Sequence, residues 1–277
     1  MIPAEFDYVA PETLEEAIAQ LGEDSKLLAG GHSLLPLMKL RLAAPMLLVD
    51  LRRVPGLSGI QANGEVRIGA MTTHHQVATG GLGLLSAAAA TIADQQVRNR
   101  GTIGGSLAHA DPASDLPGVV LAADATIVAR GYEGERSIAA ADFFKDYLET
   151  ALGPDDVITE VVLPALDGYA YGYEKFNRRH EDWAMAAVSA LVKVEGGVCS
   201  DVRIGLTHMG STPLRAHATE EALRGQSLDA ASIGKAADQA AEGTSPPADL
   251  NATADYKRNL ARVLCRRALE KVAAASG

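Results

Sequence analysis

The chain has 277 residues, of which 47% are hydrophobic and 22% are charged, so it can bury a large core divided between two or three lobes. This composition excludes a chain that is disordered throughout. The formal net charge is −10, and Lys and Arg are dispersed, which argues against a nucleic-acid partner or an anionic membrane surface. No segment reaches the roughly 18 uninterrupted apolar residues of a membrane span, and the N-terminus lacks the pattern of a signal peptide. We therefore expect an acidic cytoplasmic protein with no integral membrane segment.

The first 57 residues predict a compact α/β lobe. Apolar residues recur at helical spacing over residues 14–21, and Gly22 ends that pattern. A short apolar strand at 26–29, a Gly-Gly turn, a helical run at 34–40 and another strand at 46–50 follow. The predicted order is a helix and then a strand, a turn, a helix and a strand.

The rest of the chain predicts two further regions. Residues 58–165 contain short β-type runs at 66–69, 125–130 and 157–163 and an Ala-rich helix at 84–92, so we expect a second, α+β lobe. Residues 166–277 begin with two β-rich runs, 183–195 and 198–208, which Gly196-Gly197 joins as a hairpin. Helices near 216–223, 230–241 and 255–275 follow. We therefore expect three regions with boundaries at 57/58 and 165/166.

A first glycine-rich loop, residues 29–33, reads Ala-Gly-Gly-His-Ser and lies between a predicted strand and a predicted helix. Successive backbone N–H groups in such a loop can converge on an anion, and glycine lets a phosphate approach without a Cβ clash. Ser33 can add a hydroxyl donor. An ordinary strand-to-helix turn is the alternative, since a short glycine motif is weak support by itself.

A second glycine-rich loop, residues 101–106, reads Gly-Thr-Ile-Gly-Gly-Ser. Two such loops suggest a ligand with two phosphates. Neither is a Walker loop, because no Gly-Lys-Ser/Thr follows, and residues 81–86 lack the third glycine of a dinucleotide fingerprint. The pattern does not indicate a nicotinamide site of the usual kind.

Other candidate sites are weaker. The two cysteines lie far apart and cannot form a four-thiolate cage for an iron–sulfur cluster or zinc, so we expect both to be buried small side chains. No metal-binding spacing accompanies the histidines. A hydrolase triad of Ser33, His32 and Asp50 has no nucleophile elbow, and His32 beside Ser33 is badly placed as its base. The cysteines are Cys199 and Cys265, and the histidines considered are His74, His75, His109 and His180.

Residues 28–41 and 101–106 together resemble the FAD-binding medium subunit of carbon monoxide dehydrogenase and, more distantly, the flavin domain of xanthine dehydrogenase. The resemblance continues through residues 69–74, 155–164, 173–175 and 179–182, so it covers most of the chain. It implies an α+β fold, with a two-lobed FAD-binding region of the vanillyl-alcohol-oxidase/PCMH type followed by a smaller C-terminal domain with an antiparallel sheet and helices.

The resemblance also implies which residues hold the FAD. The two glycine loops would hold the pyrophosphate and nearby ribityl atoms, Asp115 would accept from ribose hydroxyls, and Ile158 would contact one face of the isoalloxazine. Tyr173 and Lys175 would lie beside the ring. The implied FAD-binding residues are Leu28, Ala29, Gly30, Gly31, His32, Ser33, Leu34, Val97, Gly101, Thr102, Gly104, Gly105, Ser106, His109, Ser114, Asp115, Ile158, Tyr173 and Lys175.

Some of these residues also have a structural interpretation. Asp115 can be a helix N-cap before Leu116-Pro117. Tyr173 can be a core aromatic residue of a strand, and Lys175 a solvated strand residue. The family often has Asn or Asp where Ser106 stands, and a hydroxyl in that place could still donate.

The resemblance implies that this flavoprotein subunit of a molybdenum hydroxylase passes electrons from partner [2Fe–2S] clusters to an external acceptor. The molybdopterin would lie in a large subunit and the clusters in a small one, with a dimer of heterotrimers as the expected assembly. Residues 173–182 are the expected partner-facing edge. The alternatives are a self-sufficient FAD-dependent oxidoreductase of the same superfamily and a non-catalytic nucleotide-binding subunit.

Overall fold

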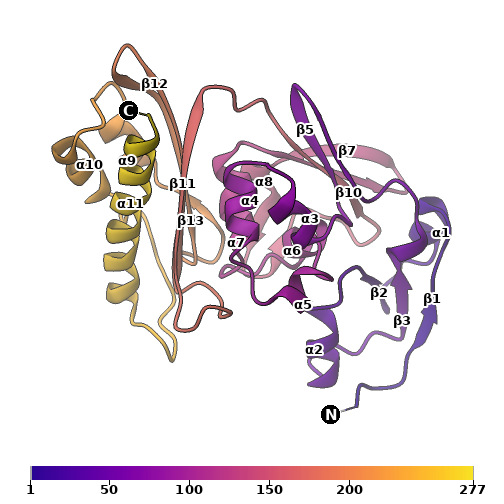
Figure 1. The fold of residues 1–277 in the computed structure, drawn as a ribbon. Helices are drawn as coiled ribbons and strands as arrows, with labels where there is room; N and C mark the ends of the chain where they lie inside the picture. Colours follow the sequence, from indigo (N-terminus) through magenta and orange to yellow (C-terminus); the bar gives the residue numbers. More distant parts are fainter. Residues whose placement is uncertain (1, 277) are drawn as a thin grey trace.

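The computed structural model describes residues 2–276, and its N-terminal region is a three-stranded parallel sheet in the order β1-β3-β2 (Figure 1). Helix α1 begins where the Thr13 hydroxyl accepts from the N–H of Glu16, and it buries Ala17 and Ile18. The elements are β1 (Asp7–Val9), α1 (Leu14–Ala19), β2 (Ser25–Leu28), α2 (Leu34–Lys39), β3 (Leu47–Asp50) and the 3-10 helix η1 (Leu51–Arg53).

The second region is a five-stranded antiparallel sheet with helices packed against it. The strand order is β4-β5-β10-β6-β7, so the late strand β10 lies in the centre. The strands are β4 (Ile60–Asn63), β5 (Glu65–Gly69), β6 (Thr126–Gly131), β7 (Gly134–Ala139) and β10 (Val157–Leu163), beside a separate hairpin of β8 (Phe144–Asp146) and β9 (Glu149–Thr150). The helices are α3 (His74–Thr79), α4 (Leu84–Ala89), α5 (Gln95–Arg98), α6 (Ile103–His109), α7 (Asp115–Ala122) and α8 (Ala140–Phe143).

The C-terminal region is a four-stranded antiparallel sheet in the order β11-β12-β13-β14. Helices α4 and α7 pack on one face, and α9 and α11 pack on the other, with the long α11 lying along the sheet (Figure 1). The first seven residues of β12 are all buried, because both faces of this strand are covered. The elements are β11 (Tyr169–Phe176), β12 (Ala186–Glu195), β13 (Val198–Thr207), β14 (Leu214–Arg215), α9 (His217–Leu223), α10 (Ala230–Ala237) and α11 (Ala254–Ser276).

Glycines allow helices to pack directly on the backbone of this sheet. A Cβ on Gly205 of β13 would lie 2.0 Å from the carbonyl oxygen of Gly118 in α7. A Cβ on Gly172 of β11 would lie 2.2 Å from the carbonyl oxygen of Ala268 in α11. Neither distance leaves room for a side chain. Glycine at these positions therefore allows α7 and α11 to pack directly on the backbone of the sheet.

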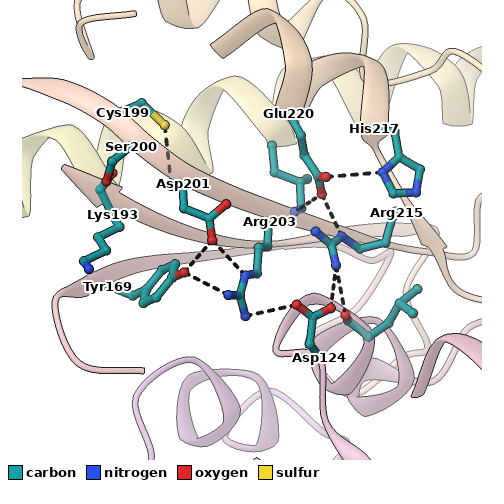
Figure 2. A network of polar contacts seen from close by, with 12 residues as sticks. Asp124, Tyr169, Lys193, Cys199, Ser200, Asp201, Arg203, Arg215, His217 and Glu220 are labelled. Carbon is teal, nitrogen blue, oxygen red and sulfur yellow. Dashed lines mark hydrogen bonds and ion pairs between the residues drawn. The ribbon is translucent and has the colours of Figure 1, made fainter. Parts of the chain in front are cut away.

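A polar network ties the end of α7 to the C-terminal sheet (Figure 2). Arg203 of β13 pairs with Asp124 at 3.1 Å, and Arg215 of β14 pairs with the same carboxylate at 2.8 Å. Arg215 also donates to Glu220 of α9 at 2.7 Å, and the N–H of Ile204 donates to the same Glu220 oxygen at 2.7 Å. The buried Glu220 carboxylate therefore accepts a hydrogen bond from the Ile204 N–H and pairs with the positive charge of Arg215.

The structure confirms the α+β class, the β2-turn-α2-β3 order and the Gly196-Gly197 hairpin. The expectation that residues 101–106 form a loop was wrong beyond Thr102, because residues 103–106 are the first turn of α6. A helix beginning near Asp115 was only an alternative interpretation of that residue, and α7 does begin there, although Pro117 and Gly118 normally interrupt helices. The boundaries at 57/58 and 165/166 stay predictions. Within residues 2–276, no helix combines the length and the apolar character that a membrane crossing requires.

We predict that Glu220→Ala lowers the free energy of unfolding by about 3 kcal/mol, because it leaves Arg215 and the N–H of Ile204 without their acceptor. Urea denaturation followed by circular dichroism measures the loss. The neighbouring exposed Glu221 provides the control, and Glu221→Ala should change stability by less than about 0.5 kcal/mol. Equal effects of the two substitutions would show that the network in Figure 2 contributes nothing beyond a surface carboxylate.

Candidate functional site

Residues from all three regions line a cavity of about 700 Å³, which lies within the range of roughly 300–1,000 Å³ that is typical of ligand sites. The β2–α2 loop, the segment from α5 to α6, strand β10 and the segment after β11 all contribute to its wall. The expected site residues that line it are Ala29, Gly30, Gly31, His32, Ser33, Leu34, Val97, Gly101, Thr102, Gly104, Gly105, Ser106, His109, Ser114, Asp115, Ile158 and Lys175.

Two expected site residues do not line this cavity. Leu28 is buried in a small core with Met38 and Leu48. Tyr173 is buried in the core between the sheets, and its hydroxyl donates a hydrogen bond to Asp115. Each of these side chains therefore packs inside the protein behind the cavity wall, and its contact with the cofactor stays a prediction.

The first glycine loop offers a row of free backbone donors. Within the described chain, none of the N–H groups of residues 30–34 donates a hydrogen bond to a protein acceptor. Gly31 has a φ of +79°, a left-handed conformation that glycine adopts without strain. A series of free N–H groups around such a residue forms a concave anion site. The loop therefore has the free donors that the predicted anion site requires.

The second glycine loop is different, because most of its N–H groups already have protein acceptors. Gly101 donates to the carbonyl of Val97 at 2.7 Å, and Gly104 donates to that of Ala70 at 2.8 Å. The N–H groups of residues 103, 105 and 106 also donate within the protein, while that of Thr102 does not. Most N–H groups of the second loop are therefore occupied, and the role of both loops in holding a pyrophosphate stays a prediction.

The glycines of the second loop serve close packing instead. A Cβ on Gly104 would lie 2.6 Å from the Cβ of Ala70. In the first loop, a Cβ on Gly30 would lie 2.3 Å from the carbonyl oxygen of Arg100 and 2.7 Å from the Cα of Gly101. The two loops therefore touch each other through bare backbone, and this contact brings Thr102 beside the free donors of the first loop.

A buried cluster joins the cavity to the C-terminal sheet. Asp115, the first residue of α7, accepts a hydrogen bond from the Tyr173 hydroxyl at 2.6 Å and one from the Lys175 ammonium at 3.0 Å. Lys175 also donates to the carbonyl of Thr91 at 3.2 Å. Burial raises the pKa of Asp115, while Lys175 and Tyr173 oppose this shift. Both Asp115 oxygens thus have protein donors, and the contact of this carboxylate with ribose hydroxyls stays a prediction.

Three further polar side chains of the wall, those of Ser106, Ser114 and His109, have partners in the protein. The Ser106 and Ser114 hydroxyls lie 2.7 Å apart. His109 lies 4.0 Å from Asp111. Ser114 is the N-cap position of α7, so Asp115 itself is not the cap. These contacts place two hydroxyls and an imidazole at the end of α6 that faces the cavity.

The two adjacent histidines point in different directions, as the sequence predicts. His74 is buried and lines the cavity, whereas His75 is exposed and its Nδ1 lies 3.0 Å from Gln95. The hydrolase triad does not form, because Asp50 accepts from Tyr8 and Arg52. Among residues 2–276, no group of three His, Cys, Asp or Glu side chains is placed to hold a metal ion.

Sequence reasoning missed two apolar residues at the mouth of the cavity. Trp183 lines it with 56% of its surface exposed. Leu148 lines it from the β8–β9 turn with a φ of +56°, which a leucine rarely adopts. The lone tryptophan of the chain was the available signal for the first, whereas nothing in the sequence marks the second.

Comparison with known proteins places these features in a family. Residues 4–166 match the model "FAD binding domain in molybdopterin dehydrogenase", and residues 171–272 match "CO dehydrogenase flavoprotein C-terminal domain". The chain belongs to the family of molybdopterin dehydrogenase flavoproteins. The family therefore places an FAD-binding domain first and a flavoprotein C-terminal domain after it.

Relatives match this chain over nearly its whole length. The carbon monoxide dehydrogenase medium chain of Hydrogenophaga pseudoflava is 42% identical and covers 97% of each chain. The 6-hydroxypseudooxynicotine dehydrogenase complex subunit alpha of Paenarthrobacter nicotinovorans is 40% identical, over 98% of this chain and 95% of that one. A solved carbon monoxide dehydrogenase structure from H. pseudoflava matches with a TM-score of 0.95 and 44% identity, covering 99% of both chains.

We predict that acid destabilises the FAD-free protein partly through His74. Burial, aided by His32 and Arg98, lowers the pKa of His74 from 6.5 to about 4. Because the unfolded chain takes up this proton at higher pH than the folded chain, stability falls as pH decreases from about 6.5 to about 4. Between pH 7 and 5 the loss from this residue is about 2 kcal/mol. Urea unfolding at both pH values should show that His74→Gln removes this share, and an unchanged pH dependence would contradict the assignment.

Proposed function

We propose that this chain holds FAD in the cavity and serves as the electron-transfer subunit of a heteromeric molybdenum hydroxylase. Bound FAD would accept electrons from a partner's [2Fe–2S] cluster and pass them to an external acceptor. The observation that carries this proposal is the row of free N–H groups at residues 30–34 beside a cavity of about 700 Å³. A chain of the FAD-binding family needs such a site for a pyrophosphate.

The wall of the cavity fits the other parts of FAD. Ile158 of β10 provides an apolar surface for one face of a flat ring, and the buried Lys175 provides a positive charge held by Asp115. A charge near a flavin ring changes its reduction potential. Trp183 and Leu148 lie at the exposed mouth and limit access to the bound group. Holding the ring and controlling access to it are this chain's own tasks.

The substrate-oxidising centre belongs on a partner in this proposal. The chain has two cysteines, and both are buried on separate elements, Cys199 on β13 and Cys265 on α11. Two separated thiols cannot ligate a cluster of the usual four-cysteine kind. We infer a large subunit with molybdopterin and a small subunit with [2Fe–2S] clusters, assembled as a dimer of heterotrimers in the cytoplasm.

The surface that faces the clusters should lie around the mouth. Tyr173, which was expected at this edge, is buried, whereas residues 178–181 are exposed. We therefore propose that, of residues 173–182, the exposed loop after β11 faces the partner. Two relatives that are named for different substrates, carbon monoxide and 6-hydroxypseudooxynicotine, are 42% and 40% identical to this chain. We infer from this that another subunit determines which substrate the complex oxidises.

We predict that Gly31→Val weakens FAD binding at least tenfold, because valine disfavours a φ of +79° and turns the N–H groups of the loop away from the phosphates. FAD content and titration of the deflavinated protein measure the effect. Gly81→Val is the matched control, since Gly81 has a φ of +69° with open space around it. Normal FAD binding by folded Gly31→Val protein would refute the anion site.

The decisive test of the function is flavin bleaching under anaerobic conditions. We predict that substrate does not bleach the FAD of the isolated chain, because the proposal places the substrate-oxidising centre on a partner subunit. Substrate should bleach it in the complex purified with its partners, and release of FAD on denaturation identifies the nucleotide. Rapid bleaching in the isolated chain would overturn the electron-transfer role and favour a self-sufficient flavoenzyme.

A further inference from the structure

His74 lies where α3 meets the second glycine loop, and no role for its side chain follows from the features described so far. It is the first residue of α3, and its N–H donates to the carbonyl of Gly101 at 2.8 Å. The side chain is only 6% exposed, and the exposed part lines the cavity. The imidazole is therefore held in place by its own backbone and opens onto the ligand space.

The two ring nitrogens of His74 have different surroundings. Nδ1 is enclosed by protein and has no hydrogen-bond partner in the described chain. Nε2 has no protein partner either, but it is not enclosed. A Cβ built on Gly101 would lie 2.9 Å from Nε2, so this nitrogen lies at the backbone of the second loop. The edge of the ring that can reach a ligand is thus the Nε2 edge.

The ring is neutral at pH 7 and carries one proton. Burial is the main cause of its lowered pKa of about 4. A buried N–H without an acceptor is rarer in proteins than a buried acceptor without a donor. The proton therefore belongs on Nε2, where a bound group can accept it, and the enclosed Nδ1 keeps a lone pair.

The space in front of Nε2 is the proposed anion site. Gly101, beside Nε2, touches Gly30 of the first loop, and the free N–H groups begin at Gly30. We propose that the Nε2–H of His74 donates a hydrogen bond to a phosphate oxygen of the FAD pyrophosphate, opposite the donors of the first loop. This assignment rests on the proposed function. It gives the second loop, whose own N–H groups are mostly occupied, a donor toward the same phosphates.

Three variants test the assignment in the protein purified with its partners, deflavinated and titrated with FAD. His74→Leu removes the donor and should weaken FAD binding roughly 10-fold or more, as expected for a hydrogen bond to a charged group. His74→Gln keeps an uncharged donor near the position of Nε2 and should bind FAD within about threefold of the wild type. His75→Leu alters the exposed neighbour and should bind FAD as the wild type does.

Phosphorus NMR of bound FAD distinguishes the loss of a phosphate contact from a general distortion of the binding site by the substitution. One of the two phosphorus resonances should shift in His74→Leu and return toward the wild-type position in His74→Gln. Wild-type affinity and an unchanged spectrum in folded His74→Leu protein would overturn the inference and leave FAD binding intact. Equal weakening in folded Leu and Gln variants would also overturn it. Failure of the wild type to bind FAD would overturn both this inference and the proposed function.

Discussion

The buried ion pair between Asp115 and Lys175 is the interaction on which the rest of the arrangement depends. A carboxylate without solvent needs a partner, and only strand β11 of the C-terminal sheet supplies Lys175 and the Tyr173 hydroxyl within hydrogen-bond distance of it. The pair therefore fixes the sheet against α7, and the glycine contacts between α7 and β13 allow that close approach. Because Asp115 and Lys175 also line the cavity, the shape of the ligand site depends on how the regions dock.

The two glycine loops look alike in sequence but use glycine for different physical reasons. In the first loop, Gly31 takes up a left-handed backbone and leaves a row of N–H groups unpaired. In the second, Gly104 removes a clash with Ala70, the residue after β5, so that α6 can begin close to this segment. One loop thus provides donors, and the other provides a wall close enough for a ligand to touch both. In a site of this kind, the N–H dipoles of the first loop attract an anionic group, and the closely packed second loop limits the shape of the group that fits.

Much of this fold could be predicted from the sequence, and the failures have identifiable causes. Elements with clear periodicity, such as β2, α2, β13 and α11, appear close to their predicted residues. Helix α7 was only an alternative interpretation of Asp115, and its Gly118, which suits a loop, is explained by close packing against the β13 backbone. Most predicted site residues meet at one cavity, since glycine-rich segments and their neighbours are local signals. The burial of Tyr173 and His74, and the pairing of the Tyr173 hydroxyl with Asp115, depend on contacts between distant segments that local sequence patterns do not encode.

The roles of the polar groups in this chain follow from whether they are paired within the protein. Asp115, Glu220 and Asp124, which could otherwise serve as acids or bases, are held by arginine, lysine or tyrosine partners and act as structural acceptors. In the described cavity wall, the uncharged donors without a protein partner are backbone N–H groups and the neutral imidazole of His74, and the exposed side chains of Lys26, His32 and Glu181 line the cavity as well. Uncharged donors bind and orient a phosphate without moving protons to or from a substrate. The free N–H groups of the first loop are therefore suited to holding a phosphate in place, and the buried Asp115–Lys175 pair keeps its own charges within the protein.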